Sequence, residues 1–98
     1  MNIEVKRKSE EVIIEVEGRL DTTTAPSLDK TINENINDVN VLVLDLKELK
    51  YISSAGLRVL LSAQKKIQKN GSMKVRNVCE EIMEIFDMTG FTDILTIE

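Results

Sequence analysis

The sequence predicts a single α/β domain, spanning residues 1–98, in which helices pack alongside a mixed β-sheet. Segments in which every second residue is apolar alternate along the chain with segments whose apolar residues recur every three to four positions, which is typical of alternating strands and helices. Residues 39–46 are apolar almost throughout, as expected for a central strand covered on both faces. Such alternation implies crossover connections. The 98 residues are enough for one modest core.

The N-terminal segment predicts a β-hairpin. Apolar and charged residues alternate at 3–6 and, more clearly, at 12–17. We expect the turn between the two strands at Glu10-Glu11 and the end of the second strand at Gly18, because glycine is depleted in strand interiors.

A helix and the central strand follow the hairpin. Thr24 is the expected N-cap, because its hydroxyl can accept a free backbone N–H of the first turn, and Pro26 suits that turn. Leu28, Ile32 and Ile36 then form one apolar stripe of an amphipathic helix. The central strand at 39–46 comes next.

A second helix and a further strand are expected after the central strand. The helix begins after residues 51–54 and carries apolar residues at helical spacing to about Asn70, where an Asn-Gly pair is typical of a helix end. The alternating segment at 73–78 predicts the next strand.

The C-terminal segment predicts a third helix and a short last strand. Asn77 and Glu80 resemble a capping pair that opens the helix, and Gly90 ends it. Residues 94–97 are expected to form the last strand. The predicted order is therefore β-β-α-β-α-β-α-β.

The composition excludes several functional classes. The chain contains no histidine, which removes every Ser-His or Cys-His catalytic pair and every histidine-ligated metal, and a lone cysteine, Cys79, cannot form an intrachain disulfide. A net charge of −4 argues against nucleic-acid binding, which usually needs a basic surplus. The polar N-terminus and the absence of an apolar run of about 20 residues predict no signal peptide and no membrane span. We expect a cytoplasmic protein that acts through another protein, with no metal or cofactor.

Three local patterns resemble catalytic or metal-binding motifs, but their context favours structural roles. Asp45 follows an apolar strand, as does the magnesium-binding Asp of P-loop NTPases, yet no glycine-rich phosphate loop accompanies it. Ser62 and Lys65 match the S-x-x-K signature of penicillin-interacting enzymes, but they fall in the middle of a predicted helix. Cys79 has no partner residue and is expected to pack. We therefore expect no catalytic residue.

Ser53 and Ser54 lie where the second helix begins, and this position has two interpretations. In the first interpretation, one serine caps the helix and the other is incidental. Alternatively, the free N–H groups and the positive dipole end stabilise an anion, so that a phosphate on Ser54 would be favoured by its own helix. Gly56 leaves the first turn open to close approach, and Arg58 supplies a cation one turn further along.

Four features in one order resemble a known family. The segment 18–21 reads Gly-Arg-Leu-Asp, an apolar third strand follows, the turn at 53–57 reads Ser-Ser-Ala-Gly-Leu, and residues 85–91 read Ile-Phe-Asp-Met-Thr-Gly-Phe. These features, which extend over essentially the whole chain, resemble the STAS fold of the anti-sigma factor antagonists. The chain departs from the family at Ser53, where relatives carry an acidic residue before the phosphoacceptor.

The resemblance implies a protein switch rather than an enzyme. It implies that the unphosphorylated form binds an anti-sigma factor that is itself a serine/threonine kinase and frees the sigma factor, and that phosphorylation of Ser54 ends this binding. The protein is expected to be a monomer or weak dimer. The expected partner-binding residues come from two loops and the start of the second helix: Asp21, Thr22, Ser53, Ser54, Ala55, Gly56 and Arg58.

Several alternatives stay open at this point. Asp21 is either an interface carboxylate or a residue of the turn that enters the first helix, and Arg58 either balances the phosphate or is an ordinary solvated residue. The same fold could serve as an adaptor subunit of a lipid-transport or stress-signalling assembly without any phosphorylation. A serine hydrolase built on Ser54 is disfavoured because the chain has no histidine and no well-placed lysine.

Overall fold

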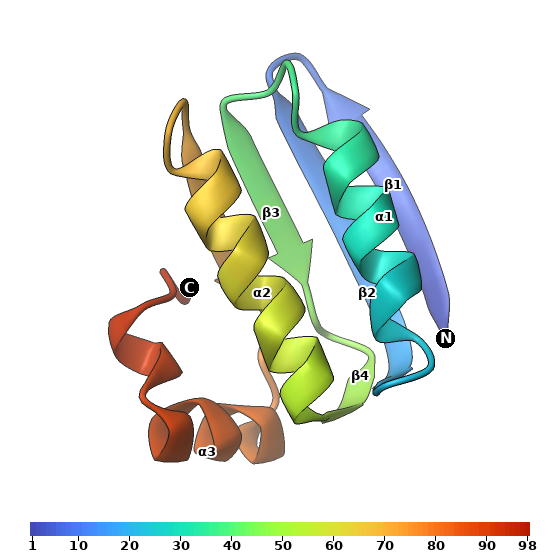
Figure 1. The fold of residues 1–98 in the computed structure, drawn as a ribbon, viewed down its shortest axis with the longest axis vertical. Coiled ribbons are helices and arrows are strands. Elements are labelled where there is room, and N and C mark those ends of the chain that lie inside the picture. Colours follow the sequence, from blue (N-terminus) through green and yellow to red (C-terminus); the bar gives the residue numbers. More distant parts are fainter.

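A computed structural model describes residues 1–98 and shows one mixed sheet with α1 and α2 on the same face and α3 across one end (Figure 1). The predicted α/β class, with helices packed alongside a mixed sheet, is confirmed. In chain order the elements are β1 Asn2–Lys8, β2 Glu11–Leu20, α1 Ala25–Asn35, β3 Val41–Asp45, β4 Leu49–Ile52, α2 Ser54–Ile67, β5 Ser72–Arg76, α3 Glu80–Thr89 and the 3-10 turn η1 Phe91–Asp93.

The sheet has the strand order β1-β2-β3-β5, and β4 continues beside β2 after β3 has ended. β1 is antiparallel to β2, whereas β3 and β5 run parallel to it through the crossovers α1 and α2. The register places Ile14 beside Leu44 and Leu44 beside Val75, so one row of apolar side chains crosses the sheet below the helices. The helices themselves are joined at the surface, where the Lys66 ammonium donates a hydrogen bond of 2.7 Å to Asn33 Oδ1.

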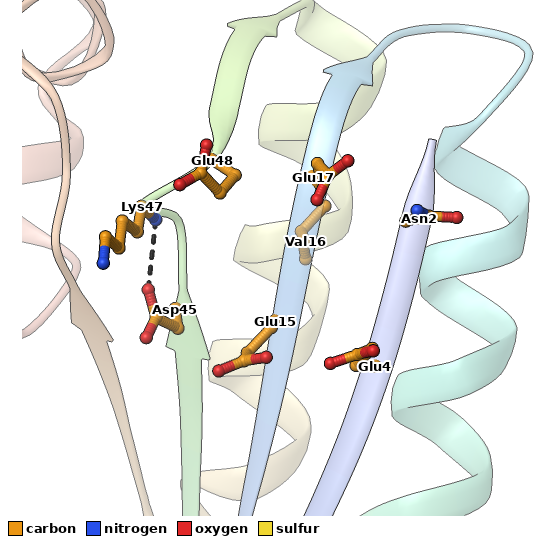
Figure 2. Close-up of a pocket in the computed structure, with 8 residues that line it drawn as sticks. All are labelled: Asn2, Glu4, Glu15, Val16, Glu17, Asp45, Lys47 and Glu48. Atoms are coloured by element: carbon orange, nitrogen blue, oxygen red, sulfur yellow. Dashed lines mark hydrogen bonds between the residues drawn. The ribbon is translucent and has the colours of Figure 1, made fainter.

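The two faces of the sheet differ in their chemistry. The alternating residues Val12, Ile14 and Val16 of β2 are buried in the core that α1, α2 and α3 complete. The intervening side chains of β2 point to the other face, away from α1 and α2 (Figure 2), where a hollow of about 280 Å³ opens. The hollow is strongly acidic, and its lining residues are Asn2, Glu4, Glu15, Val16, Glu17, Asp45, Lys47 and Glu48. No group of acidic, histidine or cysteine side chains in the chain is arranged to hold a metal ion, and no helix has both the length and the apolar character needed to cross a membrane.

The largest difference from the expected elements lies around Gly18 and β4. Gly18 does not end β2, since the strand continues to Leu20 through a register shift at Gly18, where φ is +103°. This left-handed conformation is accessible to glycine at little cost. Beyond the shift, β2 pairs in parallel with β4, a strand of four residues that is absent from the predicted order of elements.

Other element boundaries also move. The hairpin turn is Ser9-Glu10 instead of Glu10-Glu11, the central strand is shorter than 39–46, and α2 ends at Ile67 before a closing turn. The expected last strand at 94–97 is reduced to one parallel bridge between Ile97 and Val75.

The predicted capping pair of α3 is wrong. Cys79 takes the N-cap position without a side-chain bond, and Asn77 has a φ of +59°. The Asn77 amide instead donates to Asp45 Oδ1 at 3.1 Å, which fastens the start of this segment to the end of β3. Gly90 ends α3 in the left-handed conformation, as expected.

We predict that Leu60→Ala lowers the free energy of unfolding by about 2–5 kcal/mol, because the deleted side chain leaves a cavity in a packed core. Leu60 lies on the inner face of α2 and is fully buried. Leu61→Ala on the same helix is the matched control, since Leu61 is only half-buried and its loss should be smaller. Urea unfolding of both variants measures the difference, and equal losses would contradict the assigned orientation of α2.

Candidate functional site

Ser53 is the last residue of the connection between β4 and α2, and both its backbone and its side chain form hydrogen bonds there. Its backbone N–H donates to Leu20 O at 2.9 Å, which joins the start of α2 to the end of β2. Its side-chain Oγ accepts from Gly56 N at 3.4 Å, and its carbonyl accepts from Leu57 N at 2.9 Å. Ser53 is therefore the N-cap of α2, and the capping role that the sequence left open between two serines belongs to it.

Ser54 is the first residue of α2, and it is exposed. Its hydroxyl makes no hydrogen bond within the chain, in contrast to the capping hydroxyl of Ser53. The positive end of the helix dipole and the free N–H groups of the first turn lie beside it, and this turn carries no acidic side chain. The site thus presents an unengaged hydroxyl in surroundings that favour a negative charge.

Gly56 allows this helix end to lie directly on the sheet. The residue is buried, and a Cβ atom built at its position would be 2.8 Å from both Ile52 Cγ1 and Leu20 Cγ. Any larger residue would push the start of α2 away from β2 and β4. The sequence predicted that some group approaches Gly56 closely, and the groups that do so belong to the chain's own core. Ala55 beside it is half-buried.

Asp21 organises the loop between β2 and α1. Its Oδ1 accepts the Thr23 hydroxyl at 2.7 Å, Thr23 N at 3.1 Å and Thr24 N at 3.2 Å. These bonds, led by that from the Thr23 hydroxyl, lower the pKa of the Asp21 carboxyl below its ordinary value, against a smaller opposing effect of burial. The expected capping by the Thr24 side chain is wrong, because its hydroxyl donates to Arg19 O at 2.7 Å and accepts from Asp21 N at 2.8 Å instead.

Arg19 and Tyr51 belong to the same surface, although sequence reasoning did not single them out. The Arg19 guanidinium lies 4.1 Å from the centroid of the Tyr51 ring, a cation–π contact, and its Nε is 3.9 Å from Asp21 Oδ2. These contacts connect the end of β2, the exposed side of β4 and the Asp21 loop. No alternation marks β4, because its two middle residues, Lys50 and Tyr51, are both exposed between buried neighbours, and Arg19 meets Tyr51 only through the pairing of β2 with β4.

A groove of about 420 Å³ runs between the N-terminal parts of α1 and α2, and it gathers three of the predicted binding residues, Thr22, Ala55 and Arg58. Arg58 is exposed and faces the groove from α2, while Asp29 faces it from α1. The other lining residues are Ala25, Pro26, Val59 and Ser62. Ser54 adjoins the groove through Ala55, and the Asp21 loop adjoins it through Thr22.

We predict that Asp21→Asn lowers the free energy of unfolding at neutral pH and that the loss shrinks in acid. Because the folded-state pKa of Asp21 is lowered, its ionised form stabilises the fold above the ordinary carboxyl pKa of 3.8, and this contribution disappears as the pH falls through the folded value. Denaturant unfolding from pH 7 down to pH 3 measures it. Glu34→Gln, an exposed carboxylate on α1, is the matched control, and a difference between the Asp21 variant and wild type that stayed constant with pH would contradict the assignment.

Solved structures resemble this fold over nearly its whole length. An anti-sigma factor antagonist from Mycobacterium paratuberculosis matches with a TM-score of 0.90 at 24% identity, over 98% of this chain and 83% of that one. The antagonist SpoIIAA matches in its unphosphorylated form with a TM-score of 0.79 at 16% identity, over 99% of this chain and 87% of that one. Its phosphorylated form, from Bacillus, matches with a TM-score of 0.78 at 17% identity, over 99% and 91%. At these identities the matches establish the fold.

The sequence has closer relatives. An anti-sigma-B factor antagonist from Bacillus subtilis (strain 168) is 31% identical over 98 residues, which are 99% of this chain and 90% of the relative. Residues 2–98 match the STAS domain family, so all the elements described above fall within the matched region. The chain therefore belongs to the STAS domain family.

Proposed function

We propose that this protein is an anti-sigma factor antagonist that releases its partner when Ser54 is phosphorylated. The observation that carries the proposal is that two adjacent serines have different roles. Ser53 is the N-cap of the helix, whereas the exposed Ser54 hydroxyl forms no hydrogen bond within the chain. The name of the Bacillus subtilis relative, an anti-sigma-B factor antagonist, supports the assignment of the partner class.

The docking face of the unphosphorylated protein combines the Asp21 loop, the Ser53 turn and the groove between α1 and α2. The proposed partner is an anti-sigma factor that is itself a serine/threonine kinase, and docking would displace the sigma factor. The residues proposed to contact it are Asp21, Thr22, Ser53, Ser54, Ala55 and Arg58, with Gly56 setting the height of the helix end above the sheet.

The switch itself is a phosphoryl transfer to Ser54. The kinase passes the γ-phosphoryl group of its ATP to Ser54 Oγ, the hydroxyl proton leaves, and ADP is released. The new group carries about −1.5 to −2 charges. It lies at the positive end of α2, one helical turn from Arg58, so the isolated protein accommodates it readily.

Binding, in contrast, is weakened by this charge. A partner surface that accepts a neutral hydroxyl would have to desolvate a dianion. A loss of only about 1.4 kcal/mol in binding free energy already lowers the affinity tenfold. No change of fold is needed. The comparable similarity of this fold to the phosphorylated and unphosphorylated forms of SpoIIAA supports a switch by local charge alone.

An adaptor role in a larger assembly, without phosphorylation, is the competing function. It would use the same docking face but would not require a free hydroxyl at the start of α2. The names of the relatives favour the antagonist over the adaptor.

We predict that the anti-sigma factor kinase proposed as the partner, given ATP, adds one phosphate to the wild type and to Ser53→Ala but none to Ser54→Ala. Intact-mass spectrometry reads the result. Ser53→Ala should cost about 1 kcal/mol through the lost cap, so its fold is checked by circular dichroism before the assay. Phosphate on Ser54→Ala would move the switch to another residue, and no phosphate on any form would favour the adaptor.

A further inference from the structure

The two edges of the sheet differ in whether the chain itself covers them. Beside β5, Val75 N donates to Thr96 O at 2.9 Å and Glu98 N donates to Val75 O at 2.8 Å, so the C-terminal segment pairs with that edge. β1 forms the other edge and has β2 as its only neighbour in the sheet (Figure 1). An open edge strand offers unpaired N–H and C=O groups to another strand.

The backbone hydrogen bonds of β2 and its flanking residues determine which backbone groups of β1 are free. Val41 N donates to Glu10 O at 3.2 Å and Gly18 N donates to Glu48 O at 3.0 Å, so the even-numbered residues direct their backbone toward β3 and β4. Successive residues of a strand direct their backbone to opposite sides, so the odd-numbered residues of β2 bond to β1. Their partners are the even-numbered residues of β1, paired as Glu4 with Glu15.

The outward-directed backbone groups of β1 therefore belong to Ile3, Val5 and Arg7. A second copy of β1 fits this edge when it runs antiparallel and sets odd residues opposite odd residues. With the two-fold axis at Val5, all seven residues of β1 pair, since the strand extends three residues to either side. Val5, an apolar side chain that is 40% exposed, then meets its own symmetry mate.

The charges of β1 select this register over its neighbours. An axis at Glu4 would set two carboxylates directly opposite each other, and an axis at Lys6 would do the same with two ammonium groups. The axis at Val5 instead sets Glu4 opposite Lys6 of the second copy, twice. Opposite charges at directly opposed positions stabilise a strand pair, and like charges destabilise it.

The surroundings of Glu4 add to this preference. Within the chain Glu4 is paired with Glu15, and both line the acidic hollow (Figure 2). Lys6 already lies 3.3 Å from Glu15. A second copy would bring its own Lys6 to Glu4, so each ammonium group would lie between two carboxylates.

We propose that this protein forms a two-fold dimer by antiparallel pairing of β1 with β1 of a second copy, centred on Val5. Since β1 and β4 pair with opposite edges of β2, the dimer leaves the Ser54 turn, which follows β4, open to a partner. The contact is one strand wide, so the dimer is a weak one.

Charge reversal tests the register directly. In sedimentation equilibrium at low ionic strength, Glu4→Lys and Lys6→Glu should each raise the dimer Kd by about tenfold or more, because both symmetry-related pairs become repulsive. The combined variant with both changes should return to within about threefold of the wild-type Kd, since it recreates an opposite-charge pair. Lys8→Glu is the matched control: Lys8 would face Asn2, and its reversal should have little effect.

Amide hydrogen exchange by NMR supplies a second readout on the wild type. Raising the protein concentration should slow exchange at Ile3, Val5 and Arg7, whereas Glu4 and Lys6 already bond to β2. A wild type that stays monomeric at millimolar concentration, a combined variant as weak as the single ones, or concentration-dependent protection confined to other elements would each overturn the proposal.

Discussion

The candidate site depends on the hydrogen bond from Ser53 N to Leu20 O, which joins the start of α2 to the end of β2. Leu20 is followed at once by the Asp21 loop, so the same contact brings that loop beside the proposed phosphoacceptor. The absence of a side chain at Gly56 permits it, because a Cβ atom there would collide with Leu20 and Ile52. The buried core thus determines where an exposed hydroxyl is presented.

Some charges of the site are present in the unmodified protein, and one more is added when Ser54 is phosphorylated. Hydrogen bonds lower the pKa of the Asp21 carboxyl below its ordinary value, and Arg19 lies against both this carboxylate and the Tyr51 ring. The first turn of α2 has no acidic residue, and its dipole favours a negative group at Ser54. One covalent modification therefore changes the charge of the surface without competing with a bond that the fold needs.

Much of the fold could be predicted from the sequence because its strands and helices carry clear periodicity. The strand β4 could not, since four residues give too little periodicity and its pairing depends on the shift at Gly18. The capping pair Asn77–Glu80 failed because Asn77 finds a tertiary partner in Asp45, which local sequence does not reveal. Similarly, the Thr24 hydroxyl bonds back to Arg19 rather than to α1.

The candidate site shows the same limit. The serine pair at a helix start could be recognised from the sequence, but its two members became distinct only through the bonds of Ser53 to Leu20 and Gly56. Arg19 and Tyr51 face each other only because β2 and β4 are neighbours, so no local pattern pointed to them.

Calorimetric titration of the kinase partner, without ATP, into the unmodified protein and into protein carrying phosphate on Ser54 measures whether the added charge alone ends binding. We expect the phosphate to raise the Kd at least about tenfold while the thermal unfolding midpoint of the isolated protein does not fall. Equal affinity of the two forms would contradict it, and so would weaker binding accompanied by loss of the folded structure.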